Sequence, residues 1–193
     1  MKLNSTSQIL FIFPQNKNSY KARAFFLEKQ NGIWKCIYKN LYCFIGKNGI
    51  VKNRIQNTNT TPIGNFGFIY GFGIKDNPGT NFPYIKITNK NYWVTDSNSI
   101  FYNRMSFIYK GWDKSEEEHL IDFGYLYNYS MVIDFNYYFP IKGVGAGIFL
   151  HVAKKNSTGT SGCISLLEKD LINILKKLDK NKFPRIIITS RES

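Results

Sequence analysis

His151 and Cys163 are the two side chains of this sequence whose types and spacing fit a reaction centre. A thiol is only slightly ionised near pH 7, so a nucleophilic cysteine needs an imidazole or a positive charge beside it. An apolar strand is expected to end around His151, and a loop of small and polar residues then leads to Cys163. Such a loop can bring the two side chains within hydrogen-bond reach, which predicts Cys163 as the nucleophile and His151 as its general base.

The residue directly before Cys163 suits the approach of a carbonyl substrate. Gly162 has no side chain to crowd the attacked carbon, and it leaves the backbone N–H groups around Gly162 and Cys163 to stabilise an oxyanion. Taken alone, one cysteine and one histidine twelve positions apart fit a buried structural thiol and an ordinary histidine about as well. The other histidine, His119, follows the acidic run 116–118, which is more typical of a solvated face than of a site.

Metal and nucleotide chemistry are not expected. The chain has three scattered cysteines, no CxxC or HxxxH spacing and no phosphate-binding loop, so we predict neither a metal nor a cofactor. Cys36 and Cys43 are expected to face each other across a hairpin with its turn at 38–41. A disulfide is geometrically allowed there, but two buried free thiols are favoured, and Cys163 is the odd thiol in either case.

Size and composition point to one folded domain. The 193 residues are 43% hydrophobic and 17% aromatic, which excludes disorder, and no apolar run approaches the ~18 residues of a membrane span. Twenty-six basic and 13 acidic residues give a net charge of +13, which favours anionic partners such as wall polymers. The lysines are scattered within a general bias toward Asn, Ile, Tyr and Phe, so dedicated nucleic-acid binding is not expected.

Short strands separated by turns dominate the predicted secondary structure. Asn31-Gly32 predicts a hairpin turn, and residues 70–113 predict long loops between short strands because no clean period runs through them. The expected strands are residues 9–13, 21–30, 33–38, 41–46, 130–135, 148–152 and 185–189.

One helix is predicted, late in the chain, within the segment SLLEKDLINILKKLDKN. Ser165 and Glu168 have the spacing of a capping box, and lysines near the end of the segment complement the helix dipole. Five apolar residues at helical spacing are expected to form its buried face: Leu167, Leu171, Ile174, Leu175 and Leu178.

The segment around Cys163 resembles the active-site motif of the L,D-transpeptidase catalytic domain, also called the YkuD-type domain. In that family an upstream histidine is followed by a Ser/Thr-x-Gly-Cys turn, and here the turn is Thr160-Ser161-Gly162-Cys163. Familiar members carry a second histidine before the glycine and an arginine two positions after the cysteine, where this chain has Ser161 and Ser165. These departures resemble a divergent branch of the family.

The resemblance covers roughly residues 8–189. None of the outlying pieces is specific alone, but their order around a His…Gly-Cys pair is hard to obtain by chance. The pieces are residues 45–49, 61–64 with Phe66, 70–71, 93–96 with Ser99, 102–103, and the GVGAGIFLH run.

The resemblance implies a mostly β fold with a late helix, namely the family's mixed β-sandwich-like single domain, over residues 1–193. It implies that the Cys163 thiolate attacks a peptidoglycan stem peptide at the carbonyl between the L-centre of a diamino acid and the following D-residue. His151 would be the base, and the backbone N–H groups of Ser161, Gly162 and Cys163 would hold the oxyanion. Four residues are candidates for lining the substrate cleft, although a structural role fits each of them equally well: Trp93, Tyr102, Asn103 and Arg104.

Three functions stay open. An L,D-transpeptidase passes the acyl group to an amine of a second stem, whereas an L,D-carboxypeptidase passes it to water and trims tetrapeptides to tripeptides. A non-catalytic, basic wall-polymer-binding domain is the third. The expected location is extracytoplasmic, in the periplasm or cell wall. Because the apolar run 9–13 is too short for a secretory signal, this location assumes a leader that was removed or is non-standard.

Overall fold

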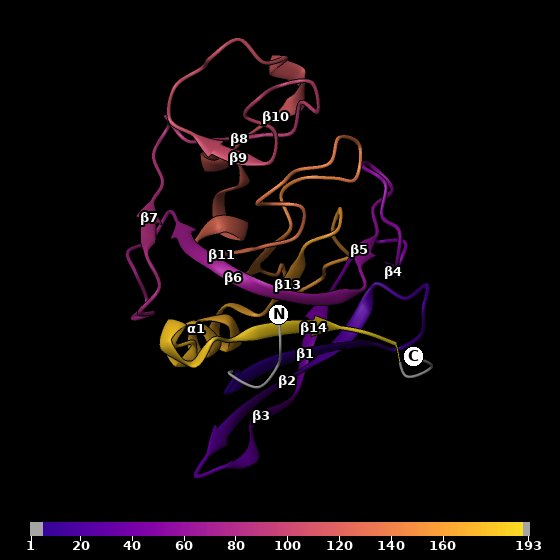
Figure 1. Ribbon diagram of the computed structural model, residues 1–193, viewed down its shortest axis with the longest axis vertical. Coiled ribbons are helices and arrows are strands. Elements are labelled where there is room, and N and C mark those ends of the chain that lie inside the picture. The colour runs from indigo at the N-terminus through magenta and orange to yellow at the C-terminus, as the bar shows by residue number, and fades with distance from the viewer. Residues whose placement is uncertain (1–5, 191–193) are drawn as a thin grey trace.

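The computed structural model describes residues 6–190, and strands are much more frequent than helices in that range (Figure 1). The N-terminal segment in which a leader would begin includes residues 1–5, which lie outside the described residues. α1 (Glu168–Lys177) is the one α-helix of the described range. The strands are β1 (Gln8–Pro14), β2 (Lys21–Gln30), β3 (Ile33–Phe44), β4 (Ile50–Val51), β5 (Thr61–Pro62), β6 (Gly64–Gly73), β7 (Tyr84–Lys86), β8 (Tyr92–Val94), β9 (Arg104–Ser106), β10 (Glu117–His119), β11 (Ser130–Ile133), β12 (Phe149–Val152), β13 (Ile164–Leu166) and β14 (Arg185–Ile188). The short 3-10 helices are η2 (Lys114–Glu116), η3 (Leu120–Tyr127) and η4 (Lys180–Lys182).

The largest sheet closes on itself. Its nine strands follow the order β11-β12-β13-β3-β2-β1-β14-β6-β7, and β6 also pairs with β11 at the other end of the series. The pairs β1–β14, β12–β13 and β6–β7 are parallel, which makes the sheet mixed. The sheet therefore wraps around an interior, and the expected mostly β, mixed fold with a late helix is confirmed.

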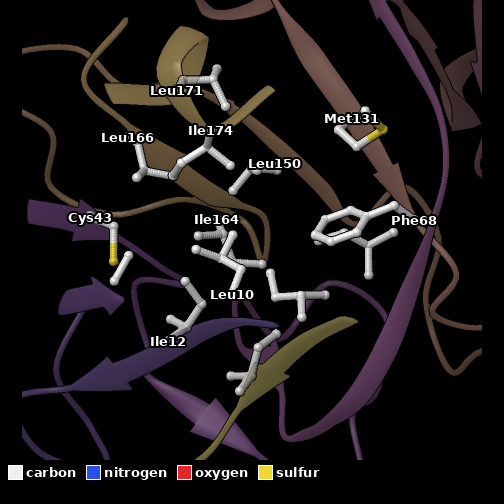
Figure 2. Packing of buried hydrophobic residues seen from close by; sticks show 14 of the residues in the cluster. Leu10, Ile12, Cys43, Phe68, Met131, Leu150, Ile164, Leu166, Leu171 and Ile174 are labelled. Carbon is white, nitrogen blue, oxygen red and sulfur yellow. The ribbon is translucent and has the colours of Figure 1, made fainter. Parts of the chain in front are cut away.

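Apolar side chains from distant parts of the sheet meet in its interior (Figure 2). Leu10 of β1, Leu150 of β12 and Ile164 of β13 are fully buried. Figure 2 shows them turned toward one another, with Leu171 and Ile174 of α1 beside them. Burial of each such side chain contributes roughly 1.5–3 kcal/mol, so this core stabilises the closed sheet and fixes α1 against it.

A small sheet of order β10-β8-β9 lies beyond one end of the large one (Figure 1). Trp93 of β8 packs edge-on against Phe149 of β12, with 4.7 Å between ring centroids. The two belong to a second buried cluster that also contains Phe72 and Tyr127. The predicted long loops with short strands over residues 70–113 are confirmed, and this packing joins β8 of the small sheet to β12 of the large one.

β3 is one continuous strand, so the predicted turn at 38–41 is wrong. The Asn31-Gly32 turn does join β2 to β3, and the two strands pair along their whole length. Asn40 has a φ of 59°, and the register of the pair shifts nearby, between Ala24 and Phe26. A β-bulge therefore accommodates the polar residues that imitate a turn in the sequence.

Cys36 and Cys43 lie seven positions apart along β3 and pair with Leu27 and Ala22 of β2. At about 3.3 Å per residue, this separation is roughly 23 Å and out of reach of a disulfide. Both are free thiols, and Cys43 is buried as expected. Cys36 is exposed, which corrects the expectation of two buried thiols.

The helix begins later than the capping-box pattern predicts. Ser165 belongs to β13, and Leu167 is the N-cap of α1 without a side-chain cap hydrogen bond. Pairing of Ser165 in the sheet excludes the local cap. Leu171, Ile174 and Leu175 are fully buried as predicted, whereas Leu167 is 40% exposed. No helix within residues 6–190 is long and apolar enough to cross a membrane.

Candidate active site

The predicted catalytic residues lie on one face of the parallel strands β12 and β13. Successive side chains of a strand point to opposite faces, and directly paired residues share a face. Leu150 pairs with Ile164 and belongs to the core, whereas His151 pairs with Ser165 on the opposite face. Cys163 directly precedes β13 and by alternation shares the face of Ser165. The two strands therefore present His151 and Cys163 to the same space.

His151 and Cys163 line one pocket of about 560 Å³. The loop between β12 and β13, residues 153–163, forms much of its wall. This loop is fixed by backbone hydrogen bonds: the Thr160 N–H donates to the Ile45 carbonyl, and the Lys47 N–H donates to the Thr160 carbonyl, each at 2.9 Å. The structure therefore contains the returning loop that the spacing of the two residues predicts.

His151 is 6% exposed and is held as a neutral imidazole. Its Nδ1 lies 2.8 Å from the Val152 carbonyl oxygen, and because a carbonyl can only accept, Nδ1 carries the proton. Burial lowers the pKa of His151 to about 4, in spite of the opposing effect of that carbonyl. Nε2 is therefore unprotonated at neutral pH, as a general base requires. The Val152 carbonyl is an orienting group that the sequence could not identify.

Two serine hydroxyls flank His151 on the neighbouring strands. Ser130 of β11 and Ser165 of β13 are both paired with His151, so the three side chains share one face. Both serines are buried, and neither Oγ has a hydrogen-bond partner among the described residues. A buried hydroxyl without a partner costs about 1–3 kcal/mol, so these groups destabilise the fold where they stand.

The Cys163 thiol is bound to the backbone of the strand beside it. Its Sγ donates to the Gly147 carbonyl at 3.1 Å and accepts from the Phe149 N–H at 3.3 Å. Burial raises the pKa of Cys163 to about 12, and the Glu118 carboxylate adds to the increase. The site at rest therefore holds a thiol and a neutral imidazole, each hydrogen-bonded to a backbone carbonyl, and not a thiolate–imidazolium pair.

Gly162 adopts a conformation that its surroundings require. Its φ is 141°, and a Cβ there would lie 2.8 Å from the Thr60 carbonyl oxygen and 3.1 Å from Arg54 Nη2. The Gly162 N–H donates to Thr160 Oγ1 at 3.1 Å, and the Thr160 hydroxyl donates to the Cys163 carbonyl at 2.6 Å. Among the three N–H groups expected to hold an oxyanion, that of Gly162 is thus engaged by Thr160 in this state.

Arg54 is a buried cation beside this turn. Its Nε donates to the Thr60 carbonyl at 2.8 Å, its Nη1 to the Val144 carbonyl at 3.1 Å and its Nη2 to the Ser161 carbonyl at 3.3 Å. One guanidinium therefore joins three segments around the pocket. No pattern in the sequence separates Arg54 from the other basic residues, so only the structure reveals this position.

Trp93 and Asn103, two of the four residues expected in the substrate cleft, lie behind the nucleophile. Asn103 Oδ1 accepts from Trp93 Nε1 at 3.2 Å and from the Gly147 N–H at 2.8 Å. Since the Gly147 carbonyl accepts the Cys163 thiol, the two side chains support the segment that holds the nucleophile.

Tyr102 supports the same glycine-rich region, whereas Arg104 lies against Tyr137 and Tyr138. The Tyr102 hydroxyl accepts from the Gly145 N–H at 3.0 Å. Arg104 Nη2 donates to the Tyr138 carbonyl at 3.3 Å, and its guanidinium lies 4.0 Å from the centroid of the Tyr137 ring. None of the four predicted cleft residues is among those that line the pocket, so the geometry gives them a supporting position.

Glu118 places a carboxylate in the pocket, although the acidic run 116–118 indicates a solvated face. Its Oε2 accepts from the Tyr127 hydroxyl at 3.4 Å, and the Tyr127 ring packs edge-on against His151 at 5.6 Å between centroids. Burial raises the pKa of Glu118 to about 7. The adjacent His119 bonds to Asp122 at 2.9 Å and is not among the residues that line the pocket.

The arrangement supports covalent chemistry by protein groups. A thiol, a neutral imidazole with an available Nε2 and backbone N–H groups at one pocket are the components of acyl transfer. Within residues 6–190, no cluster of three or more His, Cys, Asp or Glu side chains is arranged to hold a metal ion.

The chain is similar to a known protein family and to a solved structure. The L,D-transpeptidase catalytic domain, YkuD, matches this sequence over residues 16–188. The chain is similar to the solved structure of the helical cell shape determining protein Pgp2 from Campylobacter jejuni, with 13% sequence identity and a TM-score of 0.48. The similarity covers 97% of this chain and 49% of that chain, so this chain spans about half the length of that protein. No curated protein matches the sequence.

Proposed function

This chain belongs to the L,D-transpeptidase catalytic domain family, and on that premise we propose that it is a peptidoglycan L,D-transpeptidase that acts outside the cytoplasm. The observation that carries the proposal is the pocket of about 560 Å³ that Cys163 and His151 line together from neighbouring strands. A buried imidazole with its Nδ1 proton on a backbone carbonyl supports a role as base over a structural role.

In the first half of the reaction, the Cys163 thiol leaves the Gly147 carbonyl and gives its proton to Nε2 of His151. The sulfur attacks the carbonyl carbon between the L-centre of the diamino acid and the following D-residue, and the carbonyl oxygen becomes an oxyanion. When the oxyanion collapses, the C–N bond breaks and His151 returns the proton to the departing amine. The terminal D-residue leaves, and the stem remains as a thioester on Cys163.

In the second half, an amine of a second stem attacks the thioester. His151 takes the proton of that amine, a new amide bond forms, and the sulfur regains its proton as it leaves. Backbone N–H groups of the Ser161–Cys163 turn stabilise the oxyanion in both halves. The Gly162 N–H must leave Thr160 Oγ1 to take part. The N–H of Cys163, the next residue in the chain, is a second donor of the same turn.

The resting protonation states favour a stepwise order. Because burial lowers the pKa of His151 to about 4 and raises that of Cys163 to about 12, the proton stays on sulfur until a substrate arrives. A substrate that displaces the thiol from the Gly147 carbonyl removes one hydrogen bond of the thiol form. Ionisation is then coupled to substrate binding, which limits reaction of the thiol with other electrophiles.

The test is incubation of the protein with purified muropeptides, with the products identified by mass spectrometry. Cys163→Ala should abolish turnover while its melting temperature stays within a few degrees of the wild type, since the covalent route is removed altogether. Cys36→Ala is the matched control, because Cys36 is an exposed thiol that does not line the pocket, and it should keep full activity.

The products distinguish the functions. Joined stems support the transpeptidase, tetrapeptides trimmed to tripeptides indicate an L,D-carboxypeptidase, and substrate left unchanged by the wild type indicates a non-catalytic wall-polymer-binding domain. A Cys163→Ala variant that keeps most of the wild-type activity would contradict the assignment of the nucleophile.

A further inference from the structure

Glu118 faces the pocket because of its register in the small sheet. Glu118 of β10 pairs with Trp93 of β8, so the two side chains share a face. Trp93 is 1% exposed and packs against Phe149 of β12, which shows that this face is turned toward the large sheet. Glu117 pairs with Val94 and points to the opposite face. Alternation along β10 thus places one of two adjacent carboxylates in the pocket of Cys163.

The Glu118 carboxylate has no cation to neutralise it within residues 6–190. The one hydrogen bond recorded for it comes from the Tyr127 hydroxyl to Oε2, at 3.4 Å, and no ion pair includes Glu118. Burial without a charged partner raises the pKa of this carboxyl to about 7. The sequence has 26 basic residues, yet none of those described forms an ion pair with Glu118. The negative charge of Glu118 also raises the pKa of Cys163 and so opposes ionisation of the thiol.

We propose that Glu118 binds the free side-chain amine of the diamino acid in the stem peptide, and so selects stems whose amine is unmodified. An ammonium group is the partner that a partly buried, unpaired carboxylate lacks, and a charge-assisted hydrogen bond between them is stronger than a neutral one. This inference rests on the proposed function, because the stem peptide must lie across Cys163 for its side chain to reach β10.

Other charged groups of the pocket fit the same arrangement. Arg54, Lys47 and Lys154 also line it, so the remaining charged side chains of the wall are basic. They suit carboxylates of a peptide, whereas Glu118 is the one acidic side chain among the lining residues. An amine therefore has one favourable place in the pocket, and that place is Glu118.

The experiment measures binding, so that it does not depend on turnover. The probes are a synthetic tetrapeptide with a diamino acid at its third position and the same peptide acetylated on the side-chain amine. Calorimetry on Cys163→Ala should show about tenfold or tighter binding of the free-amine peptide, as expected for one charge-assisted hydrogen bond. Adding Glu118→Gln should remove this preference by weakening the free-amine peptide alone.

A matched control is Glu117→Gln in the same background, which changes the charge equally on the opposite face of β10 and should keep the preference. If Glu118 only supports Tyr127, Glu118→Gln weakens both peptides equally, and the inference is overturned. Equal binding of the two peptides by Cys163→Ala also overturns it, whatever the variants do. If neither peptide binds, both the proposed function and the role of Glu118 are contradicted. If both peptides bind equally well, only the role of Glu118 is contradicted.

Discussion

The two faces of β12 and β13 have opposite characters, although alternating residues of the same two strands form them. On the core face Leu150 and Ile164 are fully buried among apolar side chains. On the pocket face, at the next position of each strand, His151 and Ser165 are 6% and 1% exposed but polar. The Oγ of Ser165 has no partner among the described residues.

This difference separates stability from chemistry. The core face contributes free energy through apolar burial, whereas the pocket face holds an imidazole that burial keeps uncharged and a hydroxyl that has no partner among the described residues. Because strand alternation keeps the two faces apart, a substitution on one face should change one property with little effect on the other. Substitutions on each face test that separation.

The strongest test is His151→Ala on the pocket face. Loss of the base should lower the acylation rate of the folded protein by about 10²–10⁴-fold, as is typical of general base catalysis. Burst kinetics on muropeptides measures the acylation rate. His119→Ala is the control, since His119 bonds to Asp122 outside the pocket and should have no effect on the rate. If the His119→Ala enzyme were inactive and the His151→Ala enzyme active, the assignment of His151 as the base would be wrong.

On the core face, Leu150→Ala should lower the free energy of unfolding by about 2–5 kcal/mol through lost burial and a residual cavity. Urea unfolding measures this change. The folded fraction should acylate at nearly the wild-type rate, because Leu150 points away from the pocket. A loss of activity much larger than the loss of folded protein would break the separation between the faces.

The pocket, which His151 and Glu118 both line, should also show two opposing pH effects on stability. The folded-state pKa of His151 is lowered to about 4, so its contribution is fully present above about 6.5 and is lost as pH falls through about 4. The folded-state pKa of Glu118 is raised to about 7, so its contribution is fully present below about 4.5 and is lost as pH rises through about 7. Between pH 4.5 and 6.5 the two effects oppose each other.

Glu118→Gln should remove the opposing contribution of Glu118, so that the effect of His151 protonation on stability can be measured. When the pH is lowered from 7 to 4, the unfolding free energy of the variant should fall by roughly 3 kcal/mol more than that of the wild type. Urea unfolding at several pH values measures it, and Glu117→Gln is the control. Parallel pH profiles for the wild type and Glu118→Gln would contradict this opposition.

The smallest expected effect is that of Ser165→Ala. Removing a buried hydroxyl without a partner should stabilise the protein by about 1 kcal/mol, the reverse of what truncation on the core face does. The midpoint of urea unfolding measures the change. A clear destabilisation would show that Ser165 makes a hydrogen bond that matters, and the contrast between the faces would then be weaker.

Alternation and turn chemistry made much of the core face predictable from sequence. β2, the Asn31-Gly32 turn and the buried face of α1 follow from local patterns, because apolar periodicity reports which side of an element is inside. The turn predicted at 38–41 failed because a bulge and a turn use the same polar residues, and only the partner strand decides between them. Local capping at Ser165 failed for the same reason, since the residue is paired in β13.

The pocket face was predictable only in part. The position of His151 and Cys163 beside one pocket follows from a strand, a loop and a strand in sequence order. Glu118 and Arg54 reach the pocket from other sheets and loops, and their register is set by long-range pairing. The acidic run around Glu118 has no feature that separates one inward carboxylate from its outward neighbours, so its role could not be derived from the pattern.

Closure of the large sheet has a consequence for folding during synthesis of the protein. β14 lies between β1 and β6, and Leu10 pairs with Ile186, 176 positions later in the chain. During translation β1 therefore keeps one edge open until β14 leaves the ribosome, a delay of roughly 10–35 s at about 5–20 residues per second. Open edges invite pairing with other nascent chains, so we expect this chain to depend on holding chaperones until β14 has been made.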